Sequence, residues 1–397
     1  MAETREMIYL VGTSGHPNFG DEFVTAAWLK HLAQARPDAE VWLDCPNPGQ
    51  ASHLFAALHP QVRFTDSLYK LIWMYRDAPR ADAEREVRHR VEHLGTPRFD
   101  LGLLDIRRAS SLHVLGGGYS NGHWPFHVGL LTAAVRLKEL TGMSLYATGQ
   151  GFTPAPEGDS LQQALAAFDH VTVRDRASAD LTGADLSVDD AFLAIRELSG
   201  FGGDPAPQEG EVWVNLQSDL IDETGFESMV QSVRSVLEQL AAQGRPLRYL
   251  ECIPGTDGLA YEKLSDLIPA ENKVSFVELW GKEFPARPGQ TWITTREHPH
   301  VMAAACGAAG VAVELEAEAG DHAALLELGT GWSLVKPDSI AVEDAQVSKG
   351  FPYKSRMLVQ DKLSEAKKLY PAAPKPAPEP TTPQPEPRKK GGLFSRW

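Results

Sequence analysis

The sequence predicts an α/β protein with two Rossmann-like, doubly wound domains that face each other across a cleft, followed by a disordered Pro-rich C-terminal tail. Short apolar runs alternate with helical patterns, as is typical of parallel βα units. The alternation stops at a Gly- and Pro-rich stretch, Ser199 to Glu211, and then restarts. At 397 residues the chain is also too long for one ordinary core. We therefore expect a first domain at 1–200, a linker at 201–211, a second domain at 212–370 and a tail at 371–397.

The first βα unit opens the chain. Met7 to Gly12 is an apolar run of the kind that forms a strand buried on both faces, and a Gly-rich turn and a helical apolar stripe follow it. Glu40 to Leu43 is the next predicted strand. Further strands of this half are expected at Ser111–Leu115, Ser144–Thr148 and His170–Val173, with a helix at Val128–Leu140 and an exposed, charged helical excursion between Trp73 and Gly95.

The second half repeats this alternation after the linker. Strands are predicted at Glu211–Asn215, Leu247–Cys252, Gln290–Thr294 and Val311–Leu315, and helices at Gly225–Gln243 and Pro299–Ala309. A last helical pattern, Pro352 to Leu369, is expected to cross back onto the first domain.

Composition excludes several classes of function. The formal net charge is -15, which is unsuited to a broad nucleic-acid interface because such interfaces need clustered cations. Cys45, Cys252 and Cys306 lack metal-ligand spacing and are expected to be small buried hydrophobic residues. We expect no metal and no organic cofactor. The first residues contain no apolar signal-peptide core, so a cytoplasmic protein with reduced thiols is predicted.

The tail differs from the acidic body in charge. From Pro371 onward it holds five cations and two acids, and its last ten residues alternate cations with Leu393, Phe394 and Trp397. Two interpretations of this tip stay open. One is a weak, salt-sensitive contact with anionic lipid at the inner face of the plasma membrane. The other is a solvated tail with no partner.

The first candidate site is the turn that contains Asn18, Gly20 and Asp21. A glycine turn at a helix start leaves backbone N–H groups free to bind an anion. It matches neither the dinucleotide fingerprint nor a P-loop. Asp21 also has a structural interpretation as the helix N-cap, which we favour on physical grounds alone.

Two further strand ends are rich in glycine. Gly117 and Gly118 follow one predicted strand, and Gln150 and Gly151 follow the next. Ligands of open parallel sheets bind beyond the carboxyl ends of the strands. Glycine there admits a substrate close to the backbone, although a tight βα turn explains each glycine equally well.

Charged candidates follow other predicted strands. Arg174 directly follows a strand and could clamp a carboxylate or phosphate, or pair structurally with Asp189. Arg296 and His298 stand two residues apart at a helix start, which suits an anionic substrate that needs a proton donor.

In this order the motifs resemble the polysaccharide pyruvyl transferase family. They cover roughly residues 7–335 and comprise the turn at 15–22, the glycine rims at 116–118 and 149–151, the stretches at 173–178 and 189–192, and the late Arg-x-His motif at 296–298. The resemblance implies two glycosyltransferase-like (GT-B-like) domains. It also implies transfer of a pyruvyl group from phosphoenolpyruvate to a sugar of a cell-surface polysaccharide or its lipid-linked precursor, which forms a cyclic ketal.

The resemblance also implies roles for the candidate residues. His298 would be the general acid and Asp21 the base on the sugar hydroxyl, while Arg296 and Arg174 would hold the donor. The family usually carries a lysine after the last core strand. Here that stretch is acidic and lacks lysine, and protonated His322 is expected to take its place. Substrate contacts are expected from Asn18, Gly20, Gly117, Gly118, Gln150, Gly151 and Asp189.

Two alternatives remain open. A nucleotide-sugar glycosyltransferase would use the same architecture, with Glu314, Glu316 or Glu318 as an acid on the ribose. A non-catalytic relative that binds a glycan or a partner enzyme would explain the absent lysine and the tail.

Overall fold

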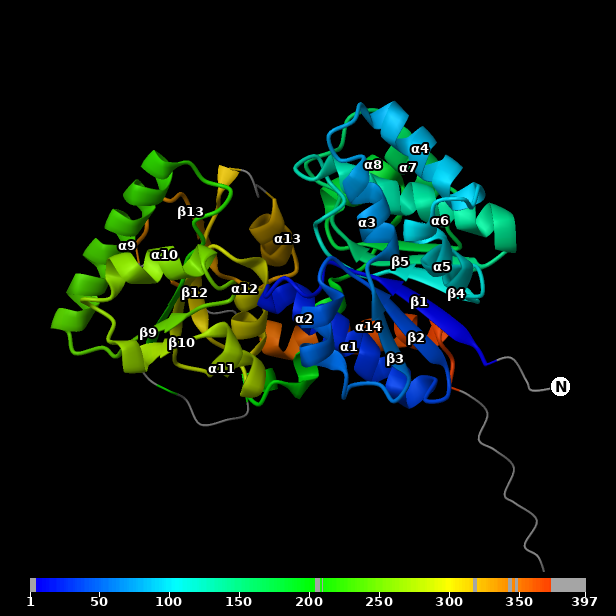
Figure 1. The fold of residues 1–397 in the computed structure, drawn as a ribbon. Helices are drawn as coiled ribbons and strands as arrows, with labels where there is room; N and C mark the ends of the chain where they lie inside the picture. The colour runs from blue at the N-terminus through cyan, green and yellow to red at the C-terminus, as the bar shows by residue number, and fades with distance from the viewer. Residues whose placement is uncertain are drawn as a thin grey trace, which may run out of the picture.

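A computed structural model describes most of the chain, namely residues 5–203, 208, 210–316, 320–341, 345–346 and 349–372. The predicted tail from residue 373 onward lies outside the described residues, as do 204–207 and 209 of the predicted linker. Figure 1 shows two lobes side by side, each built on its own sheet.

The first lobe contains seven parallel strands in the order β3-β2-β1-β4-β5-β6-β7. The order changes direction between β1 and β4, and such a switch point is where open α/β sheets bind ligands. The strands are β1 (Met7–Val11), β2 (Glu40–Asp44), β3 (Val62–Thr65), β4 (Ser111–Val114), β5 (Ser144–Gln150), β6 (His170–Val173) and β7 (Asp185–Leu186).

The second lobe contains six parallel strands in the order β10-β9-β8-β11-β12-β13, with its switch point between β8 and β11. They are β8 (Val212–Asn215), β9 (Leu247–Leu250), β10 (Lys273–Val274), β11 (Thr291–Thr294), β12 (Ala309–Val313) and β13 (Ser333–Val335). Two parallel sheets with helices confirm the predicted α/β fold class.

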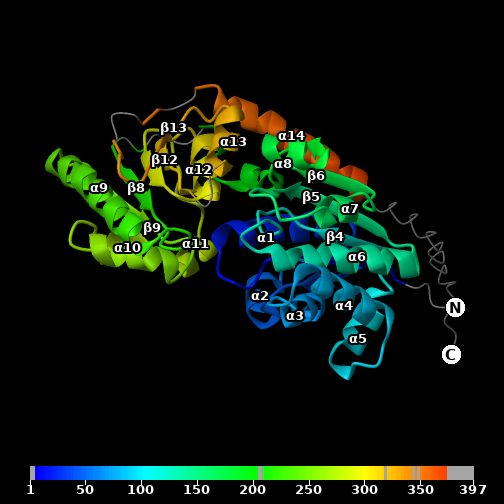
Figure 2. The same ribbon diagram turned by 90° about the horizontal axis from the view of Figure 1, so that it is seen from above.

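Helices cover both faces of each sheet (Figures 1 and 2). In the first lobe they are α1 (Phe19–Ala35), α2 (Pro48–Phe55), α3 (Ser67–Met74), α4 (Arg80–Glu92), α5 (Pro97–Ile106), α6 (Val128–Thr141), α7 (Ser160–Leu165) and α8 (Arg176–Thr182). The helices after β8 in the chain are α9 (Glu223–Ala242), α10 (Thr256–Leu264), α11 (Phe276–Gly281), α12 (Glu297–Ala305), α13 (Asp321–Glu327) and α14 (Phe351–Leu369). Short 3-10 turns are η1 (Pro125–His127), η2 (Asp190–Leu193), η3 (Ile195–Glu197), η4 (Phe201–Gly203) and η5 (Ala270–Asn272).

Strand β1 shows why its sequence is apolar throughout. Successive side chains of a strand point to opposite faces of the sheet. Ile8 and Leu10 pack into one core, whereas Tyr9 and Val11 pack into another on the opposite face. The first of these cores also contains Phe19 of α1 and continues into the second lobe, so we call it the shared core.

Two predicted helices differ from the observed ones. The Ala-rich helix was expected to reach Ala309 but ends at Ala305, because Gly307 adopts a φ of 85° that a helix cannot contain. The charged excursion is helical as predicted, yet Val87 and Val91 of α4 are buried rather than exposed. One face of α4 thus belongs to a core.

Helix α14 runs from the second lobe onto the first (Figure 2). Lys362 is fully buried there, and its Nζ lies 2.7 Å from Asp190 Oδ1 in η2. Glu365 accepts hydrogen bonds from Thr172 of β6 and pairs with His170. The last helix therefore completes the first lobe. None of the helices described is both long and apolar enough to span a bilayer.

Candidate functional site

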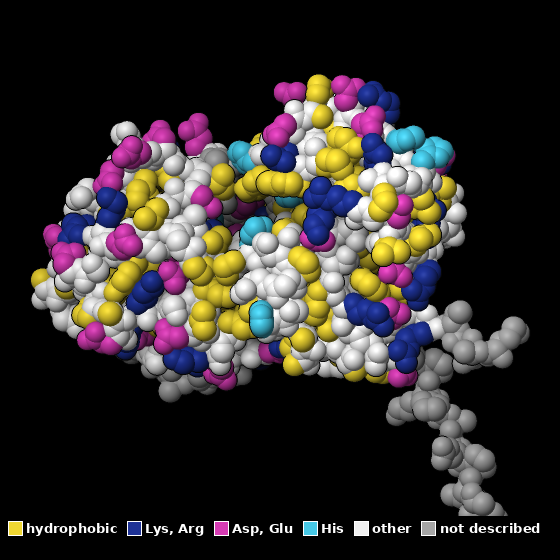
Figure 3. Space-filling view, in the orientation of Figure 1, with side chains coloured by type: hydrophobic (Ala, Val, Ile, Leu, Met, Phe, Trp, Pro, Cys, Tyr) yellow, Lys and Arg dark blue, Asp and Glu magenta, His cyan; other side chains and the backbone are white. Residues whose placement is uncertain are grey.

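A cavity of about 390 Å³ opens between the two lobes. Figure 3 shows the hollow on the molecular surface. Its walls come from the loops that follow β1 and β4 at the first switch point and β8 and β11 at the second. The two switch points thus face each other, as the fold class predicts for a binding site.

The cavity brings together most of the residues singled out from the sequence. Those that line it are Asn18, Gly20, Asp21, Gly118, Arg174, Arg296, His298 and His322, whereas Gly117, Gln150, Gly151 and Asp189 are not among its lining residues. Gln150 is fully buried and donates hydrogen bonds to the backbone carbonyls of Val114, Leu115 and Thr148. It therefore holds the ends of β4 and β5.

The start of α1 presents Asp21 to the cavity. The prediction that Asp21 is the N-cap is wrong: Asn18 caps the helix by accepting from the backbone N–H of Gly20 at 3.2 Å. Asn18 Nδ2 also donates to Asp21 Oδ2 at 3.0 Å. Burial raises the pKa of Asp21, although the charges of His298 and Arg174 oppose the shift. A carboxyl group with a raised pKa is better suited to exchange a proton near neutral pH.

His298 lies against the same helix start. A Cβ atom added to Gly20 would lie 2.2 Å from His298 Nδ1, so only glycine leaves room for the ring. Nε2 of His298 lies 3.5 Å from Asp189 Oδ1. Burial alone would lower the pKa of His298, but the carboxylate of Asp189 outweighs burial and raises it. The ring is thereby favoured in its protonated form, which a general acid requires.

Arg174 sits in a cluster of carboxylates. Its Nη1 lies 3.0 Å from Asp189 Oδ2 and 2.6 Å from Glu297 Oε2, and its Nη2 lies 3.5 Å from Asp321 Oδ2. The structural contact with Asp189 is therefore present. Burial raises the pKa of Glu297 to about 8 despite the nearby guanidinium. At neutral pH Glu297 is then mostly uncharged, which reduces the negative charge beside the guanidinium.

The glycine rims accommodate this arginine. A Cβ atom on Gly118 would lie 3.0 Å from Arg174 Nη2, and one on Gly151 would lie 3.0 Å from its Nε. Both distances are tighter than ordinary carbon contacts. In the structure these two glycines thus make space for the guanidinium.

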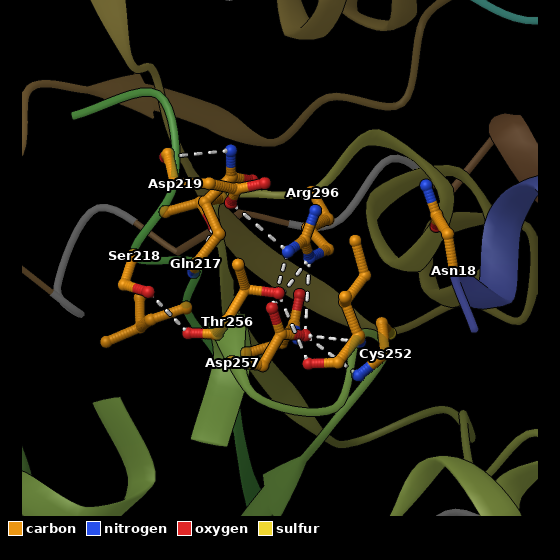
Figure 4. Close-up of polar contacts among 12 residues, drawn as sticks. Asn18, Gln217, Ser218, Asp219, Cys252, Thr256, Asp257 and Arg296 are labelled. Atoms are coloured by element: carbon orange, nitrogen blue, oxygen red, sulfur yellow. Dashed lines mark hydrogen bonds and ion pairs between the residues drawn. The ribbon is translucent and has the colours of Figure 1, made fainter. Parts of the chain in front are cut away.

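Arg296 is held from the other side of the cleft. Figure 4 shows its guanidinium aimed at Asp257, with Asp219 on the opposite side. Its Nε and Nη2 donate to Asp257 Oδ1 at 3.0 and 2.5 Å. Asp257 is fully buried and also accepts from Asn215 Nδ2 at 2.9 Å and from the backbone N–H of Cys252 at 2.8 Å. Burial opposes the charge on Arg296, but Asp257 raises its pKa, so the arginine stays charged.

His322 occupies a buried position beside the cavity. Its Nε2 lies 3.1 Å from the carbonyl oxygen of Thr295, and its Nδ1 lies 3.1 Å from Nδ1 of His300. Burial lowers the pKa of His322 to about 4. The ring is therefore neutral at neutral pH, and the protonated form that we expected in place of the lysine exists only in acid.

The cavity residues Asp321 and Glu297, and Asp257, which holds Arg296, were missed from the sequence. Asp257 and Asp321 begin helices after Gly-containing turns, which is the same pattern that singled out Asp21, and this signal could have found them. Glu297 is the middle residue of the Arg-x-His motif that was identified from the sequence. Glu314 and Glu316, considered for a ribose, do not line the cavity, and Glu318 lies outside the described residues. Within the described part of the chain, no group of three or more His, Cys, Asp or Glu side chains is arranged to hold a metal ion.

Comparison with known proteins identifies a family for the chain. A family model described as polysaccharide pyruvyl transferase matches residues 18–230, which is more than half of the chain. No curated protein matches this chain in sequence.

Solved structures share the fold at low identity. A UDP-N-acetylglucosamine 2-epimerase is 12% identical with a TM-score of 0.53, covering 96% of this chain and 99% of that one. The UDP-GlcNAc 2-epimerase from Neisseria meningitidis, bound to UDP-GlcNAc, is 11% identical with a TM-score of 0.51 and coverages of 93% and 94%. The glycotransferase of kitacinnamycin is 11% identical with a TM-score of 0.50 and coverages of 92% and 98%. These likenesses concern the GT-B-like fold alone.

Proposed function

Because the chain belongs to the polysaccharide pyruvyl transferase family, we propose that it transfers a pyruvyl group from phosphoenolpyruvate to a sugar of a cell-surface polysaccharide or its lipid-linked precursor. The observation that carries this proposal is the convergence of His298, Arg174 and Arg296 on one cavity between the lobes. Two guanidinium groups and a protonated imidazole suit a donor that carries a carboxylate and a phosphate.

In this mechanism His298 donates a proton to the methylene carbon of phosphoenolpyruvate. The adjacent carbon becomes electrophilic, and a sugar hydroxyl attacks it while Asp21 accepts the hydroxyl proton. A second hydroxyl then displaces phosphate and closes the ketal ring. Arg174 and Arg296 stabilise the carboxylate and the leaving phosphate. Asp189 holds His298 in its protonated form, since it lies 3.5 Å from the ring.

The neighbouring carboxylates explain how a trianion could enter an acidic site. Glu297, Asp321 and Asp21 all have raised pKa values, chiefly because they are buried. With a pKa of about 8, Glu297 holds a proton at neutral pH, which reduces the negative charge beside Arg174.

The test is phosphate release from phosphoenolpyruvate against a panel of lipid-linked and nucleotide-linked sugars. We expect release that depends on an acceptor. His298→Ala should lower kcat by about 10²–10⁴-fold, because general acid catalysis is lost. Arg296→Ala should chiefly weaken donor binding.

Absence of release with every acceptor would contradict the proposal. Binding of a nucleoside diphosphate without phosphate release would favour a nucleotide-sugar glycosyltransferase instead. Glycan binding without turnover of any donor would favour a non-catalytic relative.

A further inference from the structure

One wall of the cavity consists of aromatic side chains. Tyr69 and Trp73 come from α3, Tyr119 follows β4, and Trp124 and Phe126 lie at η1. We call these five residues the aromatic wall. Their rings form a chain of contacts: Trp73 meets Phe126 at 5.6 Å between centroids, and the ring of His127 lies between Phe126 and Tyr69 at 4.1 and 5.8 Å.

The two tryptophans of this wall are exposed. Trp73 is 55% exposed and Trp124 is 36% exposed, whereas Trp28 and Trp292 in the shared core are fully buried. The guanidinium of Arg76 lies 4.5 Å from the Trp73 ring, and Trp73 keeps its exposure with that group in place. Exposed aromatic rings beside a cavity are typical of surfaces that bind a ligand. Figure 3 shows hydrophobic side chains along the rim of the hollow on the first lobe.

Tyr69 adds a polar group to this wall. Its ring is nearly buried, and its Oη has no hydrogen-bond partner among the described residues. A buried tyrosine hydroxyl usually finds a partner, because an unsatisfied polar group costs free energy. Tyr69 lines the cavity, but its Oη is closed to solvent, so a ligand hydroxyl can supply the missing partner once the ring turns slightly toward the cavity.

Charged groups for an anion come from other parts of the cavity. Arg296 is the N-cap of α12 after β11, His298 lies in the first turn of that helix, and Arg174 follows β6. The face of an aromatic ring carries partial negative charge and does not favour a phosphate or carboxylate. The anionic donor is thus best placed at the guanidinium groups, which leaves the aromatic wall for a neutral partner.

We propose that the aromatic wall is the acceptor subsite, where the apolar face of a neutral pyranose ring stacks on Trp73 and Trp124 and a sugar hydroxyl bonds to Tyr69 Oη. The assignment of this wall to the acceptor rests on the proposed function, but its binding of a sugar does not depend on turnover. Because Trp73 and Trp124 are more exposed than Tyr69 and Tyr119, an oligosaccharide would extend over them toward solvent.

The experiment measures sugar binding directly. Lactose, maltose and cellobiose are titrated onto the full chain by saturation-transfer NMR, without any donor. Wild-type protein should bind at least one of them, and Trp73→Leu and Trp124→Leu should each weaken that binding about tenfold. Tyr69→Phe should weaken it less, since only one hydrogen bond is lost.

Trp42→Leu is the matched control. Trp42 also has an arginine over its ring, Arg63 at 5.6 Å, but it does not line the cavity. Its substitution should leave sugar binding unchanged, and thermal unfolding should show that all variants remain folded.

Phosphoenolpyruvate and UMP are titrated in parallel, and they separate this inference from the proposed function. Sugar binding that depends on Trp73 and Trp124, in a protein that does not bind phosphoenolpyruvate, would support the subsite and contradict the donor. Equal sugar binding by wild type and both variants would overturn the subsite, as would binding of none of the sugars. Loss of UMP binding alone in the variants would also overturn it, because the wall would then hold a nucleobase.

Discussion

At the scale of single residues, the cavity is governed by which carboxylates carry a proton. Arg174 contacts Asp189, Glu297 and Asp321. If all three were ionised, little positive charge would remain for a donor. Burial raises the pKa of Glu297 to about 8, so this group changes charge in a range that is easily measured.

We predict that phosphoenolpyruvate affinity falls as pH rises through about 8. Below this pKa Glu297 is neutral; above it, the carboxylate neutralises Arg174 and repels the anion. Glu297→Gln keeps the shape without the charge and should flatten the decline, as calorimetric titration between about pH 6 and 9 would show. Glu316→Gln, outside the cavity, is the control. A decline that persists in Glu297→Gln would assign the titration to another group, such as His298.

At the scale of elements, the start of α1 and the start of α12 must fit together. Gly20 of α1 lies directly beside His298 of α12, and no side chain fits between them. The helix start is thus shaped by a residue in the other lobe. This explains a glycine in the first turn of a helix, where it would otherwise be unfavourable.

We predict that Gly20→Ala lowers kcat about 10²-fold, because a displacement of His298 by about 1 Å misplaces the general acid. The stability of the protein should change much less than its activity. Gly49→Ala in α2 is the control, since nothing lies within 4 Å of an added Cβ atom there. Unchanged kcat in Gly20→Ala, measured by phosphate release, would show that His298 adapts without loss.

Helix α14 gives a second prediction at this scale. The ion pair between Lys362 and Asp190 is fully buried on both sides. Breaking a buried pair leaves an uncompensated charge, so Lys362→Ala should lower the free energy of unfolding by about 3–5 kcal/mol. Lys368→Ala, exposed on the same helix, should change it by less than about 0.5 kcal/mol. Chemical denaturation measures both, and equal effects would contradict the prediction.

Much of the element arrangement was predictable, because a buried parallel strand is apolar throughout and is followed by a turn residue. The ends of β1, β4, β6 and β11 were located in this way, and with them Asp21, Arg174, Arg296 and His298. Long-range partners were not predictable. Asp257 meets Arg296 only because β9 and β11 both flank β8, and neither local pattern contains that information.

At the scale of the whole molecule, aromatic rings join the lobes. Phe19 of α1 stacks on Phe284 at 5.8 Å, Phe284 stacks on Trp292 at 5.4 Å, and Trp292 stacks on Trp213 at 5.3 Å. The backbone N–H of Phe19 also donates to the carbonyl oxygen of Cys252 at 3.0 Å. The lobes therefore meet through packed apolar surface, which fixes the cavity between them.

We predict that Phe284→Ala lowers the free energy of unfolding by about 3–5 kcal/mol and also weakens donor binding. Phe99→Ala is the matched control: both rings are 2% exposed, but Phe99 packs inside the first lobe. Phe99→Ala should lower the free energy of unfolding by a similar amount and leave donor affinity unchanged. Equal donor affinity in the two variants, measured by calorimetry, would contradict a role of the shared core in shaping the cavity.

The position of α14 also has a consequence for biosynthesis. A ribosome releases the N-terminal part of a chain first, and domains generally fold in that order. Here Asp190 is buried against Lys362, which is translated only after every strand of the second sheet. In a nascent chain that has not yet exposed α14, Asp190 lacks this counter-ion and has only the hydrogen bonds from Trp28, Gly116 and Thr148 of the first lobe. We therefore expect the first lobe to reach its full stability only when α14 is available, and ribosome-bound chains that stop before residue 351 to be more sensitive to protease in the first lobe than complete ones.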